Sequence, residues 1–170
     1  MILIESIKPS GRERVMDLVQ QTGIDVSDWS NYAKGASAPA ANPRYCYEWS
    51  FESPDVVVLN LWHGNMKEEQ GRIIHRENYR GDAEAHRAAG AKSNWYQRGF
   101  ALDRSLQAAI RGNLPVRVIV NEGVRRGDDD KASTVTLRKL DNLTWTIAEY
   151  DWQTGACLLI RALHAAGHDC

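Results

Sequence analysis

The spacing of hydrophobic residues changes several times along this 170-residue chain, and each spacing predicts a different element. Residues 2–7 come close to an alternating pattern, which predicts a short strand. Ser10 and Glu13 then have the spacing of a helix capping box, and Gly23 favours the end of that helix. Its apolar stripe, which predicts packing against the rest of the fold, consists of Val15, Leu18 and Val19.

An aromatic segment follows residues 30–42, whose small, polar and helix-breaking residues predict a long loop. Every second residue of the segment carries a ring: Tyr45, Tyr47, Trp49 and Phe51. Alternate side chains of a strand share one face, so these four rings are expected to point the same way. An almost continuous apolar run over residues 56–63 predicts a second strand, buried on both faces and paired with the first as an antiparallel hairpin.

Residues 66–112 lack the alternation of a strand, and their content of Ala, Glu, Arg and Gln predicts one or two helices. Gly81 and Gly90 are the candidate breaks between them. Within a helix, Arg72, Arg76 and Arg80 would share a face, because a spacing of four residues is close to one turn.

A period of two returns after residue 114 and predicts further strands over residues 116–121, 133–140, 145–152 and 156–161. The last three are expected to form an antiparallel meander. The chain is therefore expected to have an α+β fold, with a mixed or antiparallel sheet of five to six strands and packed helices. Its length suits one domain over residues 1–163, with a tail or the start of a linker at residues 164–170.

Composition excludes several classes of protein. The hydrophobic fraction of 43% and the charged fraction of 25% are those of an ordinary soluble domain. No apolar run approaches the roughly 20 residues of a membrane span, and the start of the chain lacks the pattern of a signal peptide. The three cysteines are widely spaced, without a CxxC pair. We therefore expect a cytoplasmic protein with no metal site and no cofactor.

The net charge of −1 conceals a basic region, because residues 72–111 contain eight Lys and Arg against four Asp and Glu. Arginine favours phosphate, which its guanidinium fork binds through two hydrogen bonds. Combined with the aromatic segment, this excess points to DNA. The segment itself has two interpretations: its rings close the core, or they form a cage that stacks a flipped or modified base.

The residues expected to contact DNA fall into two groups. The first group lies near the recognised feature and consists of Arg44, Tyr45, His63 and Trp95. The second group holds the phosphate backbone and consists of Arg72, Arg76, Arg98, Arg125 and Arg126. No catalytic residue is assigned, because the sequence contains no nucleophile motif and no phosphate-binding glycine loop.

Two alternative functions fit the same sequence. Asp55, Asp129 and Asp130 loosely match the parts of a metal-dependent nuclease, although the two parts are far apart in the chain. Cleavage of DNA in magnesium or manganese would support this alternative. In the other alternative, the aromatic face docks a partner protein, and the chain binds no DNA even at low salt.

The chain resembles the N-terminal region of a group of bacterial HNH endonuclease proteins in four segments: residues 42–51, 56–63, 114–120 and 150–155. The resemblance extends from about Gly11 to Arg161. It implies a non-catalytic DNA-recognition domain of a modification-dependent restriction enzyme, whose nuclease is a separate C-terminal domain. The implied partner is double-stranded DNA with a modified base or a phosphorothioate backbone. The chain lacks the Tyr-Pro motif of one type of sulfur-binding domain, so the mark stays open, and a homodimer is a further expectation.

Overall fold

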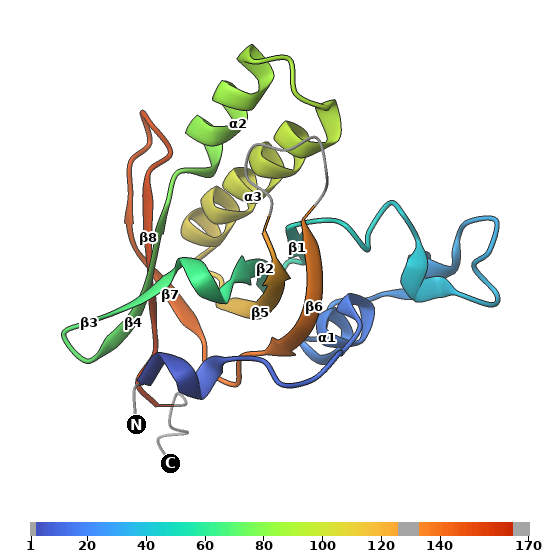
Figure 1. Ribbon diagram of the computed structural model, residues 1–170, viewed down its shortest axis with the longest axis horizontal. Coiled ribbons are helices and arrows are strands. Elements are labelled where there is room, and N and C mark those ends of the chain that lie inside the picture. Colours follow the sequence, from blue (N-terminus) through green and yellow to red (C-terminus); the bar gives the residue numbers. More distant parts are fainter. Residues whose placement is uncertain (1–2, 126–132, 165–170) are drawn as a thin grey trace.

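The computed structural model describes residues 3–125 and 133–164, and within these ranges a mixed sheet of eight strands carries the fold (Figure 1). The strands are β1 (Ser50–Glu52), β2 (Val57–Trp62), β3 (Met66–Glu69), β4 (Arg72–Glu77), β5 (Val116–Val124), β6 (Thr134–Leu140), β7 (Trp145–Tyr150) and β8 (Cys157–Arg161). The α-helices are α1 (Val15–Gln21), α2 (Tyr79–Ala88) and α3 (Ser93–Gly112). Short 3₁₀ helices are η1 (Leu3–Ile7), η2 (Ser27–Ser30), η3 (Pro39–Ala41) and η4 (His63–Asn65).

The sheet consists of two halves that meet where β5 touches β7. The strand order is β1-β2-β5-β7-β8-β4-β3, and β6 pairs with β5. β2 and β5 are parallel and are joined by the crossover through β3, β4, α2 and α3, whereas the other neighbours are antiparallel. β5 and β7 pair only through Val116 and Trp145, and beyond this point β5 pairs with β6 instead.

Helix α3 crosses the sheet and forms the main core (Figure 1). Its core side chains, Leu102, Leu106 and Ala109, pack with residues from both halves of the sheet, among them Leu59 of β2 and Leu159 of β8. Full burial of one such leucine contributes about 1.5–3 kcal/mol. Helix α1 forms a second apolar cluster with η2 and with other residues of β2 and β5.

Asp141, a fully buried carboxylate after β6, holds the junction of the two halves. It accepts two hydrogen bonds from Arg161, both of 2.7 Å, and one of 2.8 Å from Trp145 Nε1. Its backbone N–H donates to the Val118 carbonyl at 2.8 Å, and its carbonyl accepts from Arg117 Nη2 at 2.9 Å. One carboxylate residue thereby connects β5, β7 and β8.

Arg80 fixes the hairpin of β7 and β8 against α3. Its guanidinium donates to Asp103 at 3.2 Å, to the Tyr150 hydroxyl at 2.9 Å, and to the carbonyls of Trp152 and Gln153 at 3.3 Å. Tyr150 donates in turn to the buried Asp103 carboxylate at 2.6 Å, and burial raises the pKa of Tyr150. The fork of Arg80 is therefore occupied inside the protein.

Most of the predicted elements are confirmed. The fold is α+β with a mixed sheet, β1 and β2 form an antiparallel hairpin, and β2 is buried on both faces. Helix α1 ends just before Gly23, whose φ of 93° suits glycine. Residues 79–112 contain two helices, α2 and α3, as predicted, and the strands expected after residue 114 are present. The predicted break at Gly90 is confirmed, whereas the one at Gly81 is wrong, because Gly81 lies within α2, where its N–H bonds to the capping side chain of Asn78.

The helix predicted for the first part of residues 66–112 is wrong, because residues 66–77 form the hairpin of β3 and β4. Gln70 and Gly71 make its two-residue turn with positive φ angles of 50° and 71°, as a hairpin of this length requires. This hairpin explains why the strand count exceeds five to six. Arg72 and Arg76 lie on β4 and Arg80 on α2, so the three do not share a helical face.

The aromatic segment is not a single strand. Of its four rings only Phe51 lies in β1, and the other three precede it in turns and a bend. The Cys46 N–H donates to the Asn42 carbonyl at 2.9 Å, which closes a turn. Tyr45 stacks on Trp29 with ring centroids 5.2 Å apart. This tertiary contact outweighs the alternating pattern, so the four rings do not share a strand face.

Three smaller predictions also fail. The strand expected over residues 2–7 is η1 in its described part, because the backbone turns locally rather than pairing with the sheet. Helix α1 begins with Arg14 as its N-cap and no side-chain cap, so Ser10 and Glu13 do not form a capping box. β6 pairs with β5 rather than β7, which breaks the predicted meander.

Replacing Asp141 by asparagine is expected to lower the free energy of unfolding by about 3–5 kcal/mol, because the Arg161 guanidinium loses its buried counter-charge. Asp17→Asn is the matched control. It removes a carboxylate that Arg14 binds at 2.6 Å on the exposed surface, and the loss of stability is expected to be much smaller, because solvent screens an exposed ion pair. Urea denaturation compares the two variants, and equal losses would contradict the role of Asp141.

Candidate nucleic-acid interface

The residues predicted to contact DNA occupy separate parts of the structure. One set lies in the turn over residues 42–48 and in the first half of α3: Arg44, Tyr45, Trp95 and Arg98. A second set lies on β4: Arg72 and Arg76. The third lies where β2 and β5 end: His63 and Arg125. Arg126 lies outside the described residues.

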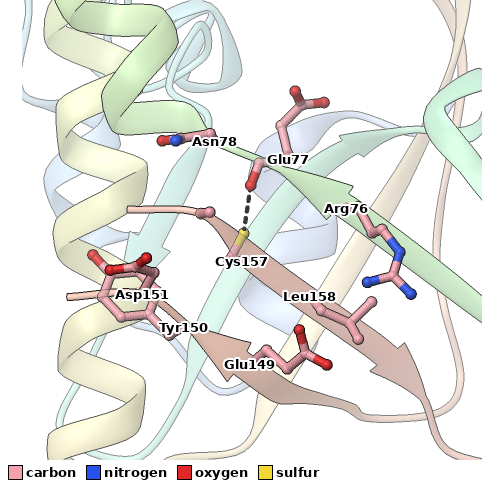
Figure 2. A pocket seen from close by; sticks show the side chains of 9 residues that line it. Arg76, Glu77, Asn78, Glu149, Tyr150, Asp151, Cys157 and Leu158 are labelled. Carbon is pink, nitrogen blue, oxygen red and sulfur yellow. Dashed lines mark hydrogen bonds between the residues drawn. The ribbon is translucent and has the colours of Figure 1, made fainter. Parts of the chain in front are cut away.

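The β4 set borders an acidic surface. Arg76 lines an open depression of about 640 Å³ over β4, β8 and β7 (Figure 2). The other charged residues of its lining are acidic: Glu77, Glu149 and Asp151. Arg76 itself pairs with Glu69 at 3.3 Å, and Arg72 donates to the Arg161 carbonyl at 3.0 Å. Like charges repel, so this depression does not suit a phosphate backbone.

Cys157 lies in the same depression but is not a reactive thiol. Its Sγ donates to the Glu77 carbonyl at 3.4 Å (Figure 2). Burial raises the pKa of Cys157 to about 12. The thiol therefore stays protonated at neutral pH and is a poor nucleophile and a poor metal ligand.

His63 and Arg125 belong to a polar cluster at the ends of β2 and β5. His63 is 8% exposed, its Nε2 donates to the Ile4 carbonyl at 3.1 Å, and its Nδ1 lies 3.9 Å from the Glu122 carboxylate. Arg125 donates to the side-chain oxygen of Asn65. These contacts connect η1 and η4 to β5. The two side chains that were predicted to contact DNA therefore bind other parts of the protein.

His75 of β4 is the most deeply buried histidine among the described residues, with 1% of its surface exposed. Its Nε2 forms a hydrogen bond of 2.7 Å with the Tyr79 hydroxyl. Burial, and secondly the charge of Arg125, lower the pKa of His75 from 6.5 to about 4. The imidazole is therefore neutral at physiological pH, and its protonation opposes folding.

The paired contacts between cations and rings show where basic and aromatic residues meet. In the described part of the chain the distances to the ring centroid are 5.0–5.9 Å, and the pairs are Arg44–Tyr45, Arg87–Phe100, Lys92–Trp95, Arg98–Tyr47 and Arg111–Trp152. A chain of this length is expected to have about two. Every pair involves α2, α3 or the turn over residues 42–48. Residues 79–112 also contain six Lys and Arg against three Asp and Glu.

A buried asparagine fixes the turn that carries the first of these rings. Asn42 is 2% exposed, and its Nδ2 donates to the Trp29 carbonyl at 3.0 Å while its Oδ1 accepts from the Arg44 N–H at 2.9 Å. Tyr45 stacks on Trp29 and lies under Arg44, and its hydroxyl donates to Asp28. This hydrogen bond lowers the pKa of Asp28. Tyr45 is therefore packed into the structure.

Tyr47 is the exposed ring of the same turn. It is 61% exposed, and the Arg98 guanidinium lies over it at 5.5 Å. Arg98 Nε lies 3.6 Å from the Glu48 carboxylate and forms no hydrogen bond. Trp95 precedes Arg98 by three residues on α3, so the two are neighbours on the helix surface. The name aromatic–basic surface is used below for Arg44, Tyr45, Tyr47, Lys92, Trp95 and Arg98.

The opposite side of α3 carries a second exposed ring that the sequence analysis missed. Trp152, in the β7–β8 hairpin, is 47% exposed and lies 5.0 Å from the Arg111 guanidinium. At 100° per residue, Arg111 and Arg98 are about 140° apart around the helix axis. The sequence contains no local signal for this pair, because Trp152 reaches α3 only through the hairpin that Arg80 holds.

The nuclease alternative depends on three aspartates, of which the structure describes one. Asp55 lies in the turn before β2, whereas Asp129 and Asp130 lie outside the described residues. Across residues 3–125 and 133–164, no group of three His, Cys, Asp or Glu side chains is arranged to hold a metal ion. In the same ranges, no helix has both the length and the apolar character to cross a membrane.

Comparison with known proteins finds no match to a family model, to a curated protein or to a solved structure.

The low pKa of His75 predicts that the protein becomes less stable as the pH decreases. Between pH 6.5 and about 4, His75 binds a proton in the unfolded chain but not in the folded chain. The contribution of His75 to the free energy of unfolding is therefore fully present above pH 6.5 and decreases below it. From pH 7.5 to pH 5 this costs about 2 kcal/mol. His75→Gln is expected to remove that part of the loss in urea denaturation. His86→Gln, at an exposed position on α2, is expected to keep it, and identical pH profiles for both variants would contradict the assignment.

Proposed function

We propose that this chain is a DNA-binding recognition module and that the aromatic–basic surface is its contact face. The observation that supports the proposal is the exposed Tyr47 ring beneath Arg98 of the basic helix α3, in a turn that also carries the exposed Arg44. Cations that contact phosphates and rings that contact bases are the two components of a nucleic-acid interface. The near-zero net charge is compatible with this function, because one basic face is sufficient.

The arginines of this surface are available to phosphate because their protein partners hold them weakly. Arg44 lies 3.7 Å from Asp28 and its side chain is 75% exposed, and Arg98 lies 3.6 Å from Glu48. Both distances exceed hydrogen-bonding length. Solvent also screens the exposed Arg44–Asp28 pair, whereas the Arg98 side chain is only 17% exposed. A phosphate that accepts two hydrogen bonds from a guanidinium competes with such a pair. Arg80 and Arg161 are different, since their forks are occupied by buried partners.

Removing one phosphate contact is expected to weaken binding to all DNA sequences alike. In fluorescence anisotropy titrations at several salt concentrations, Arg44→Ala and Arg98→Ala should each reduce the slope of log affinity against log salt by about 0.9. Arg14→Ala is the control, because Arg14 is an ion-paired arginine on the N-terminal side of α1 whose exposure is similar to that of Arg44. An unchanged slope in both test variants would contradict the proposed surface, and no binding at low salt would favour a protein-interaction module.

We further propose that the module reads a DNA mark and belongs to a restriction enzyme with a separate HNH nuclease. The resemblance of the four sequence segments supports this part. A methylated base favours contact with rings, and a phosphorothioate sulfur, which is less hydrated than oxygen, favours an apolar environment.

A gel-shift panel tests the mark. The same duplex is compared unmodified, cytosine-methylated, adenine-methylated and phosphorothioated, and one modified form is expected to bind at least about tenfold more tightly, equivalent to about 1.4 kcal/mol. Equal affinity for all four would contradict mark reading and leave general DNA binding in place.

A further inference from the structure

Resting on the proposed DNA binding, we infer that Tyr47 stacks an unpaired base, so that the preferred ligand is DNA with a base outside the double helix. The charged side chains of the aromatic–basic surface contact phosphates of any DNA. The Tyr47 ring adds the preference for an unpaired base.

Tyr47 differs from the other rings of the surface in its exposure. It is 61% exposed, whereas Tyr45 and Trp95 are only partly exposed. Tyr45 has its ring between the Trp29 ring and the Arg44 guanidinium, at 5.2 and 5.4 Å. A base therefore finds open ring surface at Tyr47.

The turn holds Tyr47 in place before any ligand binds. The buried Asn42 side chain bonds both to the Trp29 carbonyl and to the Arg44 N–H, and the Asn42 carbonyl accepts from the Cys46 N–H at 2.9 Å. A ring on a fixed backbone loses little conformational freedom on binding. The Arg98 guanidinium lies over the same ring, 5.5 Å from its centroid, and places a cation where it can contact a phosphate that flanks the stacked base.

The stacking surface of a base is accessible only when the base has left the duplex. In an intact duplex both faces of each base contact the neighbouring bases, so an exposed tyrosine reaches the backbone and groove edges but not a base face. A bulged or single-stranded base offers that face at a lower unstacking cost than a paired base. Stacking on one ring is expected to raise affinity by about 5- to 100-fold.

The test uses three probes of one sequence: an intact duplex, the same duplex with one bulged 2-aminopurine, and the single strand. Tyr47→Ala is expected to lose about 5- to 100-fold affinity for the bulged and single-stranded probes and less than about twofold for the intact duplex. Tyr47→Phe keeps the ring and is expected to bind like the unaltered protein. Trp152→Ala is the matched control, because Trp152 is also exposed beneath an arginine but lies on the other side of α3.

Quenching of the 2-aminopurine fluorescence gives a second readout. Stacking on Tyr47 is expected to quench it, and Tyr47→Ala is expected to abolish the quenching at saturating protein. An equal loss of affinity for all three probes in Tyr47→Ala, or a preference of the unaltered protein for the intact duplex, would overturn the inference and leave DNA binding intact. Failure of the unaltered protein to bind any probe would overturn the proposed function itself.

Discussion

The buried carboxylate of Asp141 is the interaction on which the arrangement of the sheet depends. The two halves of the sheet share a single residue pair, Val116 with Trp145, and one pair of backbone partners is too little to orient them. Asp141 connects the same place through Arg161, Trp145 and Val118. A buried charge needs a complete set of partners with defined geometry, so this site specifies the angle between the halves more sharply than apolar packing does.

Once the halves are joined, α3 has one place to pack, and its position decides where the candidate interface lies. Gly99 allows the close approach of α2, because an added Cβ would lie 3.0 Å from Ala83 Cβ, and the Trp49 ring is in ordinary contact distance of the same position at 3.7 Å. Ser105 donates to Ser50 of β1 at 2.9 Å. The first half of α3 therefore lies beside the turn over residues 42–48, which brings basic and aromatic residues together from positions about 50 residues apart in the chain.

The arginines of this protein lie in two different kinds of surroundings. Arg80 and Arg161 donate hydrogen bonds to buried carboxylates, and Arg80 also donates to a hydroxyl and to backbone carbonyls. These bonds stabilise the hairpin of β7 and β8. Arg44 and Arg98 have weak acidic partners and lie over rings. The same residue type is therefore fully hydrogen-bonded within the fold in one place and only loosely paired in another. The two groups differ in hydrogen bonding rather than in burial, since the side chains of Arg80 and Arg98 are 21% and 17% exposed.

The sequence by itself determined the elements whose signals are local. The α+β class, the α1 stripe, the apolar β2 and the helices within residues 79–112 follow from local composition and hydrophobic pattern, because each signal lies within a single element. A local signal for the hairpin of β3 and β4 was also present, in the Gln70-Gly71 turn, but the charged composition of β3 obscured it.

Only the tertiary structure decided the path of the aromatic segment and the grouping of the candidate site. Tyr45 leaves the strand pattern because Trp29, sixteen residues earlier, offers a stacking partner. Arg72 and Arg76 are separated from Arg98 because a strand pairing replaces the expected helix. At such positions, contacts between distant residues decide the conformation. The free energy gained by burial and stacking there exceeds the small intrinsic preference of the local sequence for a helix or a strand.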